Sequence, residues 1–258
     1  MTNLFLVYVP LIELALFNVL LAYSQYVALR AGVFSMGTAA FTALGSYAAA
    51  IVTTKYGLPT WVGVGVGLAL GTLAGAIVAV PLSRLRGVFQ ALATLALVQI
   101  VYSVALNWTD LTEGAIGING IPKTVGVETL FIAVCVVVYL MWAMGKSSIG
   151  RAFDVIREDE TVAVSLGISV QKHHMIAFTI SGGLAGLAGA LHAYSSYSIA
   201  PSDFSFNLLI SVCVSACKIG SDSISMMFRI QLEWFSLENH HHADPISTFR
   251  SDPRRIQR

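Results

Sequence analysis

The stretch TWVGVGVGLALGTLAGAIVAV, residues 60–80, decides the fold class of this chain. It contains no charged side chain, and it is as long as the roughly 20 apolar residues that a helix needs to cross a bilayer. Glycines recur at every fourth position along it: Gly63, Gly67, Gly71 and Gly75. Small residues at this spacing let two helix backbones approach closely. The stretch therefore predicts a transmembrane helix that packs tightly against another helix.

A second row of small residues lies near the C-terminal end of the apolar sequence. Gly182 and Gly186 are four residues apart, and Ala190 continues the row. The same packing argument applies to them. We favour helix packing within one chain as the role of both rows, and close packing against a second subunit is the alternative.

Composition extends this interpretation to most of the chain. Hydrophobic residues make up 56% of the 258 residues and charged residues 11%, whereas ordinary globular domains carry about 25% charged residues. Six segments are long and apolar enough to span a membrane: 4–29, 36–54, 60–80, 87–106, 128–144 and 174–197. A seventh, from Phe204, stays apolar only to Cys217. In lipid, helices satisfy every backbone amide internally. We predict an all-α, polytopic transmembrane helix bundle of about six full spans plus a partial seventh.

The basic residues of the short loops set the orientation of this bundle. Loops after the first, third and fifth spans carry seven of them: Arg30, Arg84, Arg86, Lys146, Arg151, Arg157 and Lys172. Loops after the second and fourth spans carry only Lys55 and Lys123. Basic residues collect on the cytoplasmic side, so the N-terminus is predicted to face outward and residues 146–172 to form a cytoplasmic loop. The first apolar run has no preceding Lys or Arg, and we interpret it as a membrane span rather than a cleaved signal peptide.

Several function classes find no support in the sequence. A net charge of +1 does not point to a nucleic-acid partner. No complete phosphate-binding loop of the form Gly-x-x-x-x-Gly-Lys-Ser/Thr and no Ser-His-Asp grouping occurs, so we expect no ATP site and no enzymatic activity in this chain. His240, His241 and His242 lie downstream of Cys213 and Cys217 in a spacing that matches no compact zinc pattern. We therefore predict neither a metal nor a cofactor.

Three polar side chains within the spans are candidates for a role in transport. Glu13 is an intramembrane carboxylate, a functional candidate by default, and we expect it to have no Lys or Arg partner at membrane depth. Gln90 and Gln99 are nine residues apart and are expected on opposite helix faces. His192 is expected to hydrogen-bond to a neighbouring helix. An ion-coupled secondary transporter is the alternative function, with Glu13 as its candidate coupling site.

One charged stretch, GRAFDVIREDETVAVSLG at residues 150–167, interrupts the apolar sequence. As a single helix it would place Phe153, Ile156, Ala163 and Leu166 on one face, interrupted by two carboxylates. We instead predict two short helices with a break near residues 157–159. Glu158 or Asp159 would cap the second helix, and Gly167 would end it in the left-handed conformation.

The second short helix has the form of a knob that fits a groove on a soluble partner, while a merely solvated loop is the alternative. The predicted docking residues are Glu158, Asp159, Glu160, Thr161, Val162, Ala163, Leu166 and Gly167.

Several segments, in the same order, resemble the permease subunits of bacterial branched-chain amino acid ABC importers. They are AGVFSMGTAAFTALGSYAAA (31–50), RLRGVFQALATLAL (84–97), LTEGAIGINGIP (111–122), IGRAFDVIREDETVAVSLGISV (149–170) and AFTISGGLAGLAGAL (177–191). The family's docking loop carries Glu-Ala-Ala-x-x-x-Gly. Here Ala163 and Gly167 match that pattern, whereas Thr161 and Val162 depart from it.

The resemblance implies a function and a set of partners. The chain would be the membrane-spanning permease subunit of an ATP-driven importer in a bacterial inner membrane, with cytoplasmic ATPase subunits and a second permease subunit. An external or periplasmic binding protein would deliver branched-chain amino acids or a related small solute, and the outward loop at 111–122 is expected to touch it.

The resemblance stops near Val214, and we divide the chain there. Residues 1–217 form the predicted permease domain. The 41 residues from Lys218 hold 11 charged side chains, more than their share of the 29 in the chain. This segment, 218–258, is predicted to be an atypical, disordered polar tail. A frameshift or truncation of the gene explains such a tail, and a non-functional truncated permease is the corresponding alternative function.

Overall fold

The computed structural model of this chain describes residues 2–219. Apart from its first two residues, the predicted polar tail lies outside the described residues, as do His240, His241 and His242.

Long helices form almost all of the described part, which confirms the predicted all-α, polytopic helix bundle. The six predicted full spans correspond to α1 (Thr2–Arg30), α2 (Thr38–Thr54), α3 (Thr60–Leu82), α4 (Val88–Asn107), α6 (Val127–Lys146) and α9 (Val170–Ser196). Five of the described helices are long and apolar enough to cross a membrane, and α2 is shorter at 17 residues. The partial seventh span corresponds to α10 (Phe206–Ile219), which has 14 residues.

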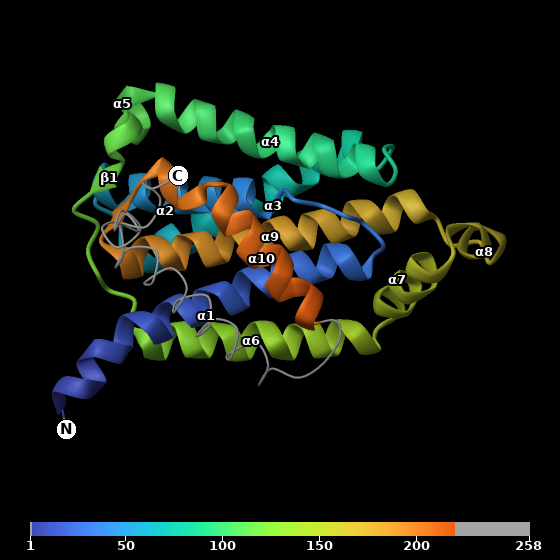
Figure 1. Cartoon of the computed structure of the whole chain (residues 1–258), viewed down its shortest axis with the longest axis horizontal. Helices are drawn as coiled ribbons and strands as arrows, with labels where there is room; N and C mark the ends of the chain where they lie inside the picture. Colours follow the sequence, from blue (N-terminus) through green and yellow to red (C-terminus); the bar gives the residue numbers. More distant parts are fainter. Residues whose placement is uncertain (1, 220–258) are drawn as a thin grey trace, which may run out of the picture.

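The remaining elements are short and lie at the two ends of the bundle. At one end lie α5 (Thr109–Thr112), η1 (Gly114–Ile116), β1 (Ile118–Asn119), β2 (Ser198–Ile199) and η2 (Pro201–Phe204). At the other end lie α7 (Ser148–Glu158) and α8 (Glu160–Ser165), beside the turns that follow α1 and α3 (Figure 1).

Helix α9 is the centre of the bundle and packs against α1, α2 and α3 (Figure 1). Helix α6 lies beyond α1 at one edge, and α4 lies at the opposite edge. Most of α1 and α9 is buried within the chain, whereas most of α3, α4 and α6 is exposed. Because these exposed faces are apolar, they suit contact with lipid acyl chains.

Both rows of glycines lie in the interface between α3 and α9. A Cβ on Gly71 would lie 2.5 Å from the Gly182 carbonyl oxygen and 2.8 Å from the Gly186 Cα atom. Gly186 also lies against the backbone of Gly45 on α2, so that three helices meet at this residue. Glycine lets the backbones come this close because it lacks the side-chain atoms that would separate them.

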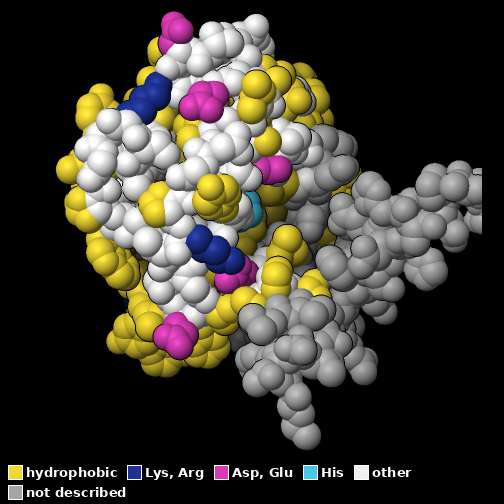
Figure 2. Space-filling view, turned by 90° about the vertical axis from the view of Figure 1, so that its left-hand side faces the viewer, with side chains coloured by type: hydrophobic (Ala, Val, Ile, Leu, Met, Phe, Trp, Pro, Cys, Tyr) yellow, Lys and Arg dark blue, Asp and Glu magenta, His cyan; other side chains and the backbone are white. Residues whose placement is uncertain are grey.

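At the end of the bundle opposite α7 and α8, β1 and β2 form a two-residue antiparallel pairing. Gly117, with φ of +73°, precedes β1, and a Cβ there would collide with the Ile199 carbonyl oxygen. Figure 2 looks at this end and shows a surface with only scattered Lys, Arg, Asp and Glu side chains. Lys55 lies at this end, where its Nζ donates to the Asp110 carbonyl oxygen at 2.5 Å.

Candidate functional site

Helices α7 and α8 form a two-helix element that projects from the end of the bundle opposite η1 (Figure 1). The predicted break between them is confirmed, and Asp159 is the residue at the break. Its Oδ1 accepts hydrogen bonds from the Thr161 amide at 2.7 Å and from the Thr161 hydroxyl at 2.5 Å. Asp159 therefore caps the N-terminus of α8, where a carboxylate is favoured by the helix dipole.

The end of α8 is also fixed by the local sequence. Gly167 adopts φ of +79°, the left-handed conformation predicted for it. Its amide donates to the Val164 carbonyl oxygen at 2.9 Å, and the Ile168 amide donates to the Ala163 carbonyl oxygen at 3.0 Å. This pattern satisfies carbonyl groups that the end of a helix would otherwise leave unpaired. A hydrogen bond at each end therefore holds a helix of only six residues in place.

The burial of individual side chains separates the inner face of the element from its outer face. Phe153, Ile156 and Ala163 are buried against the chain itself. Three apolar side chains of the α8 region are instead exposed by half or more: Val162 (50%), Val164 (61%) and Leu166 (66%). Three exposed apolar side chains therefore surround the buried Ala163 at the tip of a polar loop.

Sequence reasoning missed one exposed residue of this element. Leu166, a predicted docking residue, is exposed and follows the last residue of α8. Val164 was not among the predicted docking residues, although its side chain is also largely exposed. The other predicted docking residues, Glu158, Asp159, Glu160, Thr161 and Gly167, lie at the exposed or half-exposed rim of α8.

The element is fastened to the bundle by an ion pair that the sequence did not indicate. Arg30, the last residue of α1, donates from Nε to Asp154 Oδ1 at 2.8 Å and from Nη2 to Asp154 Oδ2 at 2.7 Å. The hydrogen bonds from this guanidinium hold the pKa of the Asp154 carboxyl below its usual value. Only 15% of the Arg30 side chain is exposed. Bidentate pairs of this kind fix orientation as well as distance.

Two further contacts involve the neighbourhood of α7 and α8. Gly32 lies against α7, since a Cβ on it would be 3.4 Å from the Arg157 Cα atom. Arg86, in the turn before α4, reaches Glu160 at 3.4 Å, but the Arg86 side chain is 80% exposed. A surface pair of this kind contributes little stability. The bidentate pair with Arg30 is therefore the stronger of these two ion pairs that join the element to the bundle.

The turn between α1 and α2, which follows Arg30, is held in place by buried polar groups. The Gln25 amide of α1 donates to the Ser35 carbonyl oxygen, and the Thr38 hydroxyl of α2 donates to the Gln25 Oε1 atom. Gln25, Ser35 and Thr38 are all buried. Each member of this network has a partner, as a buried polar group requires. A displacement of α7 would therefore act on both α1 and α2.

The structure corrects two expectations about polar residues within the spans. Glu13 does have a basic partner, because Lys123 from the loop between β1 and α6 reaches its Oε2 atom at 3.2 Å. The His192 ring stacks on Phe17 of α1 with centroids 4.2 Å apart, and its hydrogen-bond contact is with Ser196 on its own helix. Neither arrangement was accessible from sequence, because both depend on which helices and loops are neighbours.

The two glutamines of α4 lie as predicted, on different faces of the helix. Gln90 is buried and donates to the Leu82 carbonyl oxygen at 3.2 Å, whereas Gln99 is exposed. They therefore do not line one path together.

Replacing Asp159 with alanine is expected to unfold α8 selectively, because three donors at its N-terminus lose their acceptor. Hydrogen–deuterium exchange of residues 160–165 should become fast while α9 stays protected. The carboxyl pKa is held below its ordinary value of 3.8 by the hydrogen bonds from Thr161 and Val162. Capping is therefore complete above that pH and is lost as the pH falls through the lowered pKa. Slow exchange of α8 in the variant at neutral pH would contradict this role.

Comparison with known proteins identifies the family to which this chain belongs. Residues 8–217 match the model of a family described as "Branched-chain amino acid transport system / permease component". The chain is 30% identical over 209 residues to the high-affinity branched-chain amino acid transport system permease protein LivM of Escherichia coli (strain K12). That match covers 68% of this chain and 49% of LivM.

A second relative carries a different name. The autoinducer 2 import system permease protein LsrC of Enterobacter sp. (strain 638) is 30% identical over 167 residues, which cover 61% of this chain and 47% of LsrC. The chain thus spans about half the length of the curated relatives it matches. No solved structure matches the chain.

Proposed function

Because this chain belongs to the branched-chain amino acid transport permease family, we propose that it is the membrane-spanning subunit of an ATP-driven importer. The family match covers most of the long helices, and the multi-pass architecture agrees with it. Residues 1–217 are the proposed permease domain. A bacterial inner membrane is its proposed location.

The observation that carries this proposal is a group of exposed apolar side chains in the α8 region. Val162, Val164 and Leu166 are each exposed by half or more, at the basic end of the bundle and outside the long apolar segments. A soluble groove that covers these three side chains would remove their apolar surface from water. We propose that cytoplasmic ATPase subunits supply this groove, and that Asp154 and Arg30 pass the resulting motion to α1.

The solute and the other partners are proposed from the printed descriptions of the relatives. The family description and LivM favour branched-chain amino acids, while LsrC is named for the import of autoinducer 2. A second permease subunit and an external binding protein complete the proposed complex. The outward loop at residues 111–122 is the proposed contact with the binding protein.

The ion-coupled alternative depends on Glu13 as its coupling site. Glu13 is paired with Lys123, and its side chain is 10% exposed. A carboxylate that is already neutralised by a lysine is a poor site for a transported cation. The structure thus offers no observation that favours this alternative over the importer.

Replacing Leu166 with aspartate is expected to reduce co-purification with the ATPase subunits at least tenfold. The change places a charge in the centre of the proposed contact, where interfaces exclude charged residues. The chain is co-expressed with ATPase subunits from its own genome, and the tagged permease is captured from detergent. Gln171→Asp is the matched control, because it adds the same side chain at an exposed position on α9.

Equal recovery of the ATPase with Leu166→Asp and Gln171→Asp would contradict the proposal that the α8 region contacts the ATPase subunits. Ala163 is unsuitable for this test, because it is fully buried and its replacement would disturb the fold of the element.

A further inference from the structure

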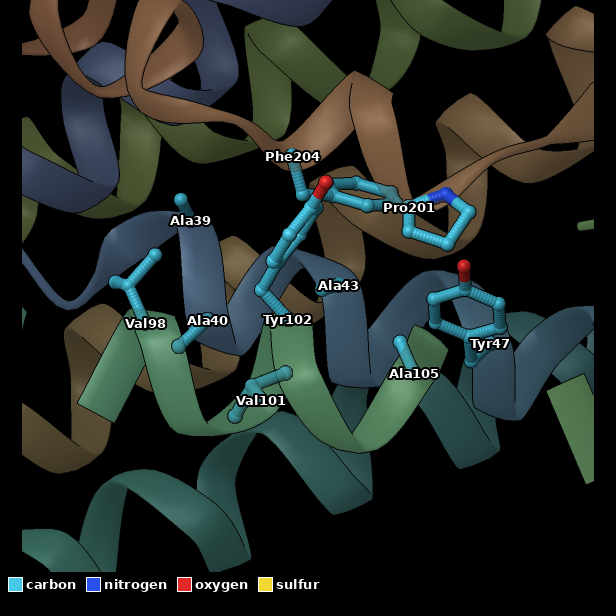
Figure 3. Close-up of a pocket in the computed structure, with 10 residues that line it drawn as sticks. All are labelled: Ala39, Ala40, Ala43, Tyr47, Val98, Val101, Tyr102, Ala105, Pro201 and Phe204. Carbon is cyan, nitrogen blue, oxygen red and sulfur yellow. The ribbon is translucent and has the colours of Figure 1, made fainter. Parts of the chain in front are cut away.

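A narrow crevice lies between α2 and α4, beside η2 (Figure 3). Small apolar side chains line its walls, with Ala40 and Ala43 on α2 and Val98 and Val101 on α4. Pro201 and Phe204 of η2 close it on the remaining side. In this structure it has room for no more than about one water molecule.

A buried hydroxyl group without a partner faces this crevice. Tyr47 on α2 is 7% exposed, and its hydroxyl has no hydrogen-bond partner within the part of the chain that the structure describes. Figure 3 shows the Tyr47 and Tyr102 hydroxyl groups both directed toward the η2 side of the crevice. Buried hydroxyl groups are nearly always paired, because leaving one unpaired costs stability. The unpaired Tyr47 hydroxyl therefore points to a ligand that residues 2–219 do not themselves supply.

The rim of the crevice adds a negative charge. Asp203 lies in η2 between Pro201 and Phe204, which line the crevice; it is exposed and accepts a hydrogen bond from the Ala200 amide at 3.0 Å. The crevice thus combines an apolar slot, an unpaired hydroxyl donor and a carboxylate at its edge. These groups complement an aliphatic side chain, a carboxylate and an ammonium group, respectively.

We propose that this crevice is a solute subsite that accepts the branched aliphatic side chain of an amino acid, with the Tyr47 hydroxyl donating to the solute carboxylate. Asp203 attracts the ammonium group at the rim. The proposal rests on the proposed importer function for its choice of solute. The crevice is closed here, so entry of the solute requires α4 and η2 to move away from α2. Helix α4 suits such a movement, because it lies at the edge of the bundle and most of its surface is exposed.

Direct binding of tritiated leucine to the purified full-length chain in lipid nanodiscs tests this subsite without any partner. Saturable binding is expected for the wild type, with isoleucine and valine competing and glutamate not competing. Ala43→Leu is expected to abolish binding, because the added side chain fills the slot. Tyr47→Phe is expected to weaken binding about tenfold, the loss typical of one hydrogen bond to a charged group. Ala96→Leu, the same change at an exposed position on α4, is the control.

The thermal midpoint separates a subsite role from a structural role. Because the Tyr47 hydroxyl makes no hydrogen bond to the described part of the chain, Tyr47→Phe should melt at or above the wild-type temperature while it binds leucine more weakly. A lowered midpoint together with weaker binding would overturn the assignment of the hydroxyl to a solute.

Other outcomes would overturn the proposal as a whole. They are the absence of saturable leucine binding to the wild type, equal binding by Ala43→Leu and Ala96→Leu, and a co-purifying phospholipid that only Ala43→Leu releases. The last outcome would identify the occupant as an acyl chain. Failure of the importer function is a separate result, because it would appear as leucine binding without ATP-dependent uptake in the reconstituted complex.

Discussion

Gly71→Leu is expected to abolish the stable fold of this chain, whereas Gly65→Leu on the same helix is expected to leave it intact. A Cβ on Gly71 would lie 2.5 Å from the Gly182 carbonyl oxygen and 3.1 Å from the Gly186 amide nitrogen. These atoms belong to the backbone of α9, so no rotation of a side chain relieves the collision. A Cβ on Gly65 meets nothing within 4 Å.

The size of the effect follows from the position of α9. Overpacking in a core typically costs about 1–3 kcal/mol when side chains can adjust. Here the leucine must separate α3 from α9, which is also the helix against which α1 and α2 pack. The loss should therefore exceed that range, a large part of the roughly 5–15 kcal/mol that stabilises a typical domain.

Detergent-solubilised protein provides the measurement. Gly71→Leu should elute as aggregate or melt more than about 10 °C below the wild type, since 1 kcal/mol corresponds to roughly 2–4 °C for a chain of this size. Gly65→Leu adds the same apolar side chain and the same gain in helix propensity, so it isolates the contact with α9. Equal melting temperatures for the two variants would show that the glycine row does not hold these helices together.

Removing the Arg30 charge is expected to disconnect α7 from α1 and, under the proposed function, to lower ATP-driven uptake at least tenfold. Arg30→Gln cannot form the bidentate pair with Asp154. Hydrogen bonds to charged groups contribute about 1.5–3 kcal/mol, and the half-exposed Asp154 places this pair at the low end of that range. The global fold should therefore survive while the connection between α7 and α1 loosens.

Two readouts separate this role from general destabilisation. Hydrogen exchange should accelerate in α7 but not in α9, and ATP hydrolysis should continue while uptake falls. The charge exchange Arg30→Asp with Asp154→Arg should recover part of the uptake. Arg151→Gln is the matched control, because Arg151 is exposed and donates to the Lys146 carbonyl oxygen rather than to a carboxylate. If Arg30→Gln took up solute at the wild-type rate, the Arg30–Asp154 pair would not be needed to transmit motion from α7 to α1.

The stabilisation that the Arg30–Asp154 pair contributes depends on pH in a predictable direction. The pKa of Asp154 is lowered in the fold, chiefly by its hydrogen bonds with Arg30. The stabilisation by the pair is therefore complete above the ordinary carboxyl pKa of 3.8 and is lost as the pH falls through the lowered pKa. Between about pH 5 and pH 8 the pair should contribute no pH dependence to uptake.

The sequence alone determined the features that depend on local length and local hydrogen bonding. Span boundaries followed from apolar runs, because the bilayer sets the number of residues that a helix needs. The break at Asp159 and the stop at Gly167 followed from helix capping, which involves only residues a few positions apart. The glycine rows were likewise visible from their spacing along a helix.

Tertiary structure decided which of these elements meet. In a soluble helix, periodicity separates a buried face from a polar one, but in a membrane helix both faces are apolar. Sequence therefore did not reveal that the two glycine rows face each other, or that Tyr47 is buried without a hydrogen-bond partner among residues 2–219. The pairs Arg30–Asp154 and Glu13–Lys123 join residues more than 100 positions apart. Such pairs form only when packing brings distant segments together, which no local pattern encodes.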